Sequence, residues 1–207
     1  MDRKKLIEIH RRRDELLRER ESWKHDWREL SRYFLPRRRR FLEDGDRANQ
    51  GGLQRGSLDS TGIYAMRDLA SGLHGGMTSP ARPWFRLSLQ NRELEGSRDA
   101  RLWLDETERR MRDILHRSNF YNAVHQFYEE LAAFGTAFMF ELADAQTAAR
   151  FHTLTVGEYC LDADEHGRVD TVFRDMDMTL RQLVRKFGLA ALPEAYAGST
   201  DYTGIFK

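Results

Sequence analysis

The chain has 207 residues, of which 40% are hydrophobic, 32% charged and 11% aromatic. This composition supplies a core beneath a charged surface and excludes a disordered chain, and the length suits one domain of ordinary size. The one cysteine, Cys160, excludes an intramolecular disulfide and a cysteine-rich zinc site, so we expect a reducing compartment. No stretch approaches the roughly 20 apolar residues that span a bilayer, so we expect a soluble chain without a membrane partner.

The net charge of +1 is unevenly distributed. Residues 1–40 hold fifteen Lys and Arg against eight Asp and Glu, which gives +7, and the remaining residues carry −6. For residues 1–33 two interpretations stay open. The arginines could bind nucleic acid, or they could form a solvated helix face that pairs with acids one turn away.

A run of four arginines follows Pro36 without an acid among them. Proline ends the preceding helix, so the run is expected to lie outside it. We expect these side chains to contact either phosphates or the acidic surface of a partner. The run consists of Arg37, Arg38, Arg39 and Arg40.

Helical periodicity predicts a long first helix that ends near Tyr33. Residues 41–56 contain four glycines and no apolar period, which predicts an exposed loop. A short helix is expected from residues 57–61 to about Leu73, stopped by the glycine pair that follows. Residues 84–90 alternate between polar and apolar side chains, which predicts a strand with one apolar face.

Two long helices are predicted next, over residues 98–116 and from a cap at Ser118 and Asn119 to Phe134. Four short segments rich in β-forming residues then predict an antiparallel meander of about four strands. Thr179 is expected to cap a helix over residues 180–187, with Gly188 as its left-handed C-terminal residue.

From Leu189 onward the sequence predicts a loop with no closing element, as if it stopped within a longer protein. The predicted fold class is α+β, with long helices around a small antiparallel sheet. We expect one domain over residues 1–207, with a charged helical segment over residues 1–35.

Catalytic motifs are missing from this sequence. Ser71 or Ser79 could be combined with His74 and Asp68, but the nucleophile elbow GxSxG is absent, and Ser71 is better explained by close helix packing. Neither GxxxxGK[ST] nor GxGxxG occurs, so no nucleotide site is indicated. We predict no catalytic residue and no cofactor.

Metal-binding spacing is missing as well. His116 and His125 lie too far apart for adjacent helical turns. Residues 162–167 superficially resemble a calcium loop, but their glycine and glutamate spacing is wrong, and a hairpin turn explains them better. We predict no metal site.

The segment LDSTGIYAMRDLASGLHGGMTSPARPWFRL, residues 58–87, resembles the hallmark of the head-to-tail connecting (portal) protein family of podoviruses. In that hallmark a DSTG turn starts a helix bearing LASGL, and a TSP-x-RPWF segment follows. Similar features occur in the family order over about residues 20–188. They include YFLPR at 33–37, FGTAFMF at 134–140 and GRVDTVFR at 167–174.

The resemblance implies a non-catalytic subunit of a ring, typically dodecameric, at one capsid vertex. Double-stranded DNA would pass through its channel without sequence readout during packaging and ejection. The implied partners are further copies of the chain, terminase, capsid and tail adaptor proteins, in the virion and, during assembly, in the host cytoplasm. A prophage origin would also fit.

The residues present resemble the wing part of a portal, and the stem, clip and crown are not recognisable. In the RPWF segment, Arg82 and Arg86 flank Trp84, a combination enriched at binding hot spots. Trp84 could equally anchor the local core while both arginines are solvated. The alternative to a portal subunit is a stand-alone basic-arm nucleic-acid-binding module that uses residues 1–40.

Overall fold

The fold is that of a computed structural model, which describes residues 3–42, 59–91, 94, 96–176, 178–192 and 205–206. Contacts within the chain group it into two units. Unit 1 comprises Met1–Arg18 and Glu158–Lys207, and unit 2 comprises Glu19–Gly157. The expectation of a single domain over the whole chain therefore stays a prediction.

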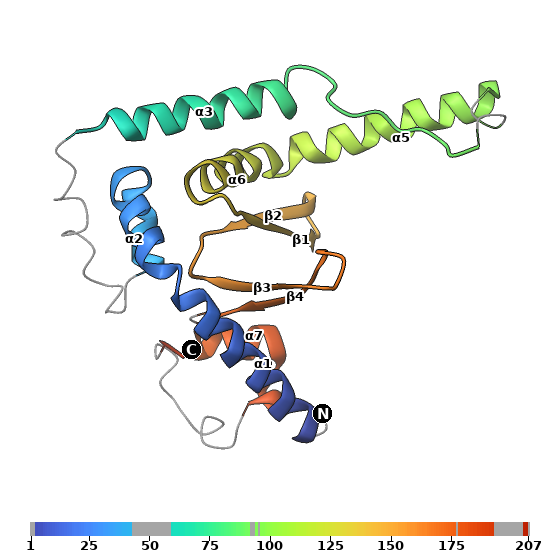
Figure 1. The fold of residues 1–207 in the computed structure, drawn as a ribbon. Coiled ribbons are helices and arrows are strands. Elements are labelled where there is room, and N and C mark those ends of the chain that lie inside the picture. Colours follow the sequence, from blue (N-terminus) through green and yellow to red (C-terminus); the bar gives the residue numbers. More distant parts are fainter. Residues whose placement is uncertain are drawn as a thin grey trace. The chain divides into compact units, whose positions relative to one another are not determined.

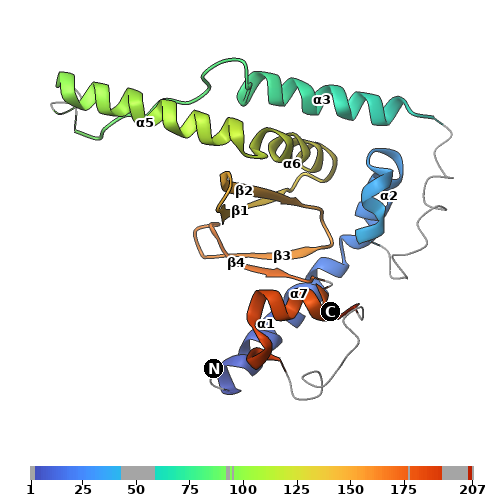
Figure 2. The same ribbon diagram turned by 180° about the vertical axis from the view of Figure 1, so that it is seen from behind.

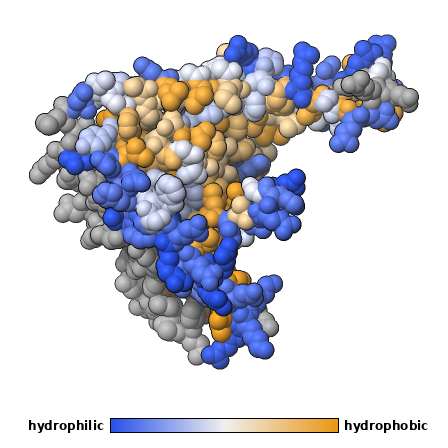
Figure 3. Space-filling view, viewed as in Figure 1, coloured by the Kyte–Doolittle hydropathy of each residue, from blue (hydrophilic) through white to orange (hydrophobic). Residues whose placement is uncertain are grey.

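Unit 2 contains most of the helices. Figures 1 and 2 show α3 beside α6, and the N-terminal half of α5 extending past both. Figure 3 shows apolar residues gathered over α3 and α6. The helices are α2 (Lys24–Tyr33), the 3-10 helix η1 (Pro36–Phe41), α3 (Thr61–Met77), α5 (Arg98–Arg117) and α6 (Phe120–Phe134).

A hairpin of β1 (Phe138–Asp144) and β2 (Ala148–Leu154) completes unit 2. Helix α6 contacts both strands and α3, and its buried face forms the centre of the core. The apolar residues repeat at helical spacing, which explains why one face of α6 is buried. The core cluster consists of Ala70, Phe120, Ala123, Val124, Tyr128, Ala149 and Phe151.

Unit 1 pairs β3 with β4 in a second antiparallel hairpin, with a bulge between Asp162 and Ala163. Thr179 and Gln182 form a capping box that begins α7, because each side chain bonds the other's backbone amide. The elements are α1 (Arg3–Glu21, whose last turn falls in unit 2), β3 (Tyr159–Ala163), β4 (Val169–Arg174), β5 (Met178–Thr179), α7 (Leu180–Phe187), η2 (Leu189–Ala191) and β6 (Ile205–Phe206).

These elements confirm the α+β class and the two long helices predicted over residues 98–116 and 120–134. The cap at Thr179 is also confirmed. Gly188 follows α7 with a positive φ of +81°, but its ψ of 155° lies outside the left-handed helical conformation predicted for it. Within the described residues, no helix is long and apolar enough to cross a membrane. The loop predicted over residues 41–56 falls almost entirely outside those residues.

Two helix predictions were wrong in their bounds. The first helix is interrupted by a turn at Ser22 and Trp23, so it forms α1 and α2. Helix α3 continues through Gly75 and Gly76 to Met77. Glycine costs a helix only about 1 kcal/mol relative to alanine, and packing of α3 against α6 offsets this cost.

The strand predicted over residues 84–90 was also wrong, because this segment pairs with no strand among the described residues. Its backbone bonds a helix instead, since the Leu87 amide donates to the Glu108 carboxylate at 3.3 Å.

The four strands after Gly135 are present, but in the described residues they pair as two separate hairpins and do not form one meander. The chain leaves β2 through Thr155, whose hydroxyl donates to Glu130 of α6.

Candidate interaction surfaces

Arg38, within the arginine run, is held by a buried acid. Its Nε lies 3.1 Å from Glu130 Oε1, and the Glu130 side chain is fully buried. The Thr155 hydroxyl donates to the same oxygen at 2.8 Å. A buried carboxylate needs such partners to remain charged, so the charge of Arg38 is compensated within unit 2.

Arg37 has different surroundings. It is exposed and borders a cavity of about 570 Å3, whose apolar lining includes Phe34, Ile63 and Met66. Arg67 of α3 borders the same cavity. In the part of the chain that the structure describes, neither arginine forms an ion pair or a hydrogen bond. We call this feature the arginine-rimmed cavity. The side chains of Arg39 and Arg40 lie outside the described residues.

The arginines of the RPWF segment also differ from each other. Arg82 donates to the carbonyl oxygens of Gly75 and Gly76, at 3.2 and 3.3 Å. These carbonyls end α3, where a cation is favoured by the helix dipole. Arg86 is exposed and has no polar partner among the described residues.

Trp84 is half-buried against the core of unit 2. Its ring stacks on Phe120 with centroids 5.8 Å apart and planes 5° apart, and its indole N–H donates to the Tyr121 hydroxyl at 3.4 Å. Such a buried aromatic with a satisfied polar group is typical of a core anchor. A contact of Trp84 with a neighbouring subunit stays a prediction.

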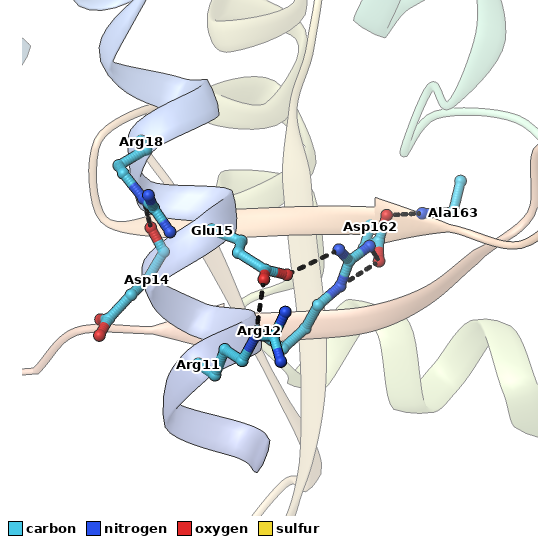
Figure 4. A network of polar contacts seen from close by, with 7 residues as sticks. All are labelled: Arg11, Arg12, Asp14, Glu15, Arg18, Asp162 and Ala163. Carbon is cyan, nitrogen blue, oxygen red and sulfur yellow. Dashed lines mark hydrogen bonds and ion pairs between the residues drawn. The ribbon is translucent and has the colours of Figure 1, made fainter. Parts of the chain in front are cut away.

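In unit 1, Arg11, Arg12 and Arg13 at the centre of α1 pair with acids, and Figure 4 shows the first two of these arginines. Arg11 Nε lies 3.1 Å from Glu15, and Arg12 bonds both Glu15 and Asp162 of β3. The hydrogen bond from Arg12 holds the pKa of Asp162 below its ordinary value. For these arginines the structure favours a solvated, ion-paired helix face over a phosphate-binding surface.

Helix α5 has a similar network of charges. Arg109 bonds Glu106 and Asp113, and Arg110 bonds Glu106 as well. The hydrogen bonds from the two arginines lower the pKa of Glu106 to about 2. On the same helix Trp103 is 62% exposed, so this chain leaves most of its indole ring unburied.

The residues considered for a hydrolase triad bond other partners. His74 Nδ1 lies 3.2 Å from the Thr78 hydroxyl, whereas the Ser79 hydroxyl accepts from the Ala81 amide. Burial, and secondarily His125, lowers the pKa of His74. No group of metal-ligating side chains occurs among the residues described.

The predicted hairpin turn after β3 is confirmed. The Asp164 carboxylate accepts from the backbone amides of His166 and Arg168, at 2.9 and 2.8 Å, and Gly167 adopts a φ of +75°. These bonds within the turn explain the acidic spacing that superficially resembles a calcium loop.

Comparisons with known proteins identify the family of this chain. A model of the family "Bacteriophage head to tail connecting protein" matches residues 6–201. The chain belongs to this family.

Two relatives are similar over most of the chain. It is 46% identical over 175 residues to the "Probable portal protein" of Bordetella phage BPP-1, and 37% identical over 176 residues to the "Portal protein" of Salmonella phage epsilon15. Each match covers 84% of this chain and 31% of the relative. The chain thus spans about a third of the length of these relatives.

Three residues of these surfaces were missed from the sequence. Glu130 belongs to an acid pair in an amphipathic helix, which usually faces solvent. Arg67 and Trp103 lie in ordinary helical patterns. The sequence did indicate one thing about Trp103: at helical spacing it lies on a different face of α5 from Leu104, which is buried.

Proposed function

We propose that this chain is the wing part of a subunit of a phage portal ring, the head-to-tail connector at a capsid vertex. The observation that carries the proposal is the 46% identity to a probable portal protein over 84% of the chain. The subunit is structural and uses no catalytic residue. Consistent with this role, unit 2 leaves an arginine-rimmed cavity and an exposed tryptophan available to partners.

In this proposal, the whole protein assembles with copies of itself, as a dodecamer, around a channel for double-stranded DNA. It contacts DNA without reading its sequence and docks terminase, capsid and tail adaptor proteins. It assembles in the host cytoplasm and remains in the virion. Arg37, Arg39, Arg40 and Arg86 are the candidates for contacts with neighbouring subunits or phosphates.

A stand-alone basic-arm module is not supported, because the arginines at the centre of α1 are paired with acids. The two functions differ in their salt dependence. A module that neutralises several phosphates would lose affinity for duplex DNA steeply between 50 and 200 mM salt, by about a thousandfold or more. The wing of a portal should bind free duplex weakly at either concentration.

The test is native mass spectrometry and negative-stain imaging of the product of the complete reading frame that contains this chain. We expect rings with a central hole wide enough for duplex DNA, and the mass gives the number of subunits. A monodisperse monomer across the micromolar range would overturn the proposal. Salt-sensitive binding of a duplex oligonucleotide by that monomer would instead establish the basic-arm module.

A further inference from the structure

The arginine-rimmed cavity is preformed on one side. Arg38 borders it and is fixed by the buried Glu130 carboxylate, so the wall formed by η1 is anchored to α6. The volume of about 570 Å3 lies within the range of about 300–1,000 Å3 that is typical of ligand pockets. Apolar side chains from α3 and from the segment between α2 and η1 line it beside the guanidinium groups of Arg37 and Arg67. Gln126 and Glu129 of α6 border it as well, so arginines outnumber the acid among the described lining residues. The cavity therefore suits a large apolar group that carries or adjoins a negative charge.

A group of this kind is displayed elsewhere on unit 2. The N-terminal half of α5 extends past α3 and α6 in both views (Figures 1 and 2), and Trp103 on it is 62% exposed. Asp99 lies one turn before Trp103 on the same side of the helix and is exposed. Among the described residues Asp99 has no ion-pair partner, whereas Glu106 is engaged by Arg109 and Arg110.

We propose that Trp103 of one copy inserts into the arginine-rimmed cavity of a neighbouring copy, with Asp99 facing Arg37 and Arg67. This inference rests on the proposed function, because it assigns an interface of the ring. An indole can pack on the apolar lining and accept a guanidinium over its face, and a carboxylate forms charge-assisted hydrogen bonds with arginine. Tryptophan and arginine are also the residues most enriched at interface hot spots.

The second copy is favoured as the occupant because the exposed arginines of one surface complement the exposed carboxylate of the other, and both surfaces occur on the same chain. They lie on different elements, since the cavity is formed by the segment after α2, η1, α3 and α6 and the inserted group by α5. Such an interface is heterologous: one surface of each subunit meets a different surface of the next. Head-to-tail contacts of this type close into a ring where the rotation permits.

The charge pair is tested by exchanging its signs in the product of the complete reading frame. Arg67→Glu and Asp99→Lys each place like charges together, and we expect each to weaken ring assembly about tenfold or more. The double variant restores opposite charges between positions 67 and 99 but leaves Arg37 beside the introduced lysine, so it should recover part of the lost assembly. Asp68→Lys is the matched control, because it changes the charge of the next residue on α3, outside the lining of the cavity, and it should assemble normally.

The apolar contact is tested separately with Trp103→Ala, which should weaken assembly about thirtyfold. Leu102→Ala removes an equally exposed apolar side chain from another side of α5 and should have no effect. Native mass spectrometry measures ring occupancy, and the circular dichroism spectrum verifies that each variant is folded.

The outcomes separate this inference from the proposed function. If the unaltered protein forms rings and the single charge variants do not weaken them, or the double variant recovers none of the lost assembly, the inference is wrong and the portal function stands. If Arg67→Glu instead lowers the thermal stability of the monomer and leaves ring occupancy unchanged, a segment of the same chain fills the cavity, which also overturns it. If the unaltered protein forms no ring, the proposed function fails first.

Discussion

The arginines of α1 and those around the cavity have opposite surroundings. In unit 1, Arg12 and Arg13 reach Asp162 and Asp175, which are 150 and 162 positions away in sequence. In unit 2, Arg37 and Arg67 form no ion pair within the described residues, although Glu129 lines the same cavity. The fold thus neutralises the arginines of α1, whereas the charges of Arg37 and Arg67 stay available to a partner.

The difference follows from how each region is built. Helix α1 carries its own acids at helical spacing, and β3 adds Asp162, so these cations are paired within unit 1. In the cavity, Glu129 lies among the lining residues but forms no ion pair with Arg37 or Arg67 within the described part of the chain, and Glu130 is engaged by Arg38. If this distinction holds, arginines of the two kinds should respond differently to mutation.

The largest effect is expected within the arginine run itself. Arg38→Met removes a cation from a fully buried carboxylate, and breaking a buried pair in this way typically costs about 3–5 kcal/mol. Arg37→Met, one position earlier, removes an exposed cation and should change the free energy of unfolding by less than about 0.5 kcal/mol. Urea unfolding followed by circular dichroism measures both. Equal losses would contradict the distinction between a paired and an available arginine.

Two of the tryptophans of unit 2, the half-buried Trp84 and the exposed Trp103, provide the next comparison. Trp84→Ala removes a ring that stacks on Phe120, and because Trp84 is half-buried we expect a loss of about 2–3 kcal/mol. Trp103→Ala removes an exposed ring and should cost the isolated chain less than about 0.5 kcal/mol. The midpoint of urea unfolding is the measurement. A large loss for Trp103→Ala would mean that its ring packs within the chain and is not displayed to a partner.

Local periodicity explains what could be predicted of the fold. The helices over residues 98–116 and 120–134 repeat apolar residues over several turns, and this pattern was enough to predict both helices. The pattern buries one face of α6, whereas on α5 Leu104 is the buried residue among those described. The alternation of polar and apolar residues over 84–90 could not distinguish a strand from an extended segment beside a helix, because both have two faces. No local pattern could show that the Leu87 amide bonds Glu108 in place of a neighbouring strand.

The interaction surfaces were less predictable, because they depend on contacts between distant segments. The sequence marked all four arginines of the run alike, yet Arg38 alone among them meets Glu130, 92 positions away, within the described side chains. The sequence indicated Trp84 as a possible contact residue because arginines flank it, but Trp103 is the more exposed of the two tryptophans. Exposure is a tertiary property, so residue type and spacing could not rank these candidates.

The smallest of the expected effects belongs to the paired region. Asp162→Asn removes the acid that Arg12 contacts, while Asp170→Asn, in the adjacent strand, removes an exposed acid that has no ion-pair partner among the described residues. We expect only the first to lower the melting temperature in low salt. At 1 M salt the screening length falls to about 3 Å, and the two variants should then melt alike.

The pH dependence of this pair has a definite sign. Arg12 lowers the pKa of Asp162 in the folded chain. The contribution of the pair is therefore fully present above the ordinary aspartate pKa of about 3.9 and is lost as the pH falls through the lower, folded value. The difference in melting temperature between Asp162→Asn and the unaltered chain should accordingly be constant near neutral pH and shrink in acid. A difference that instead persisted unchanged in acid and at 1 M salt would mean that Asp162 acts through its hydrogen-bond geometry and not its charge, and the contrast between neutralised and available arginines would then lose its electrostatic basis.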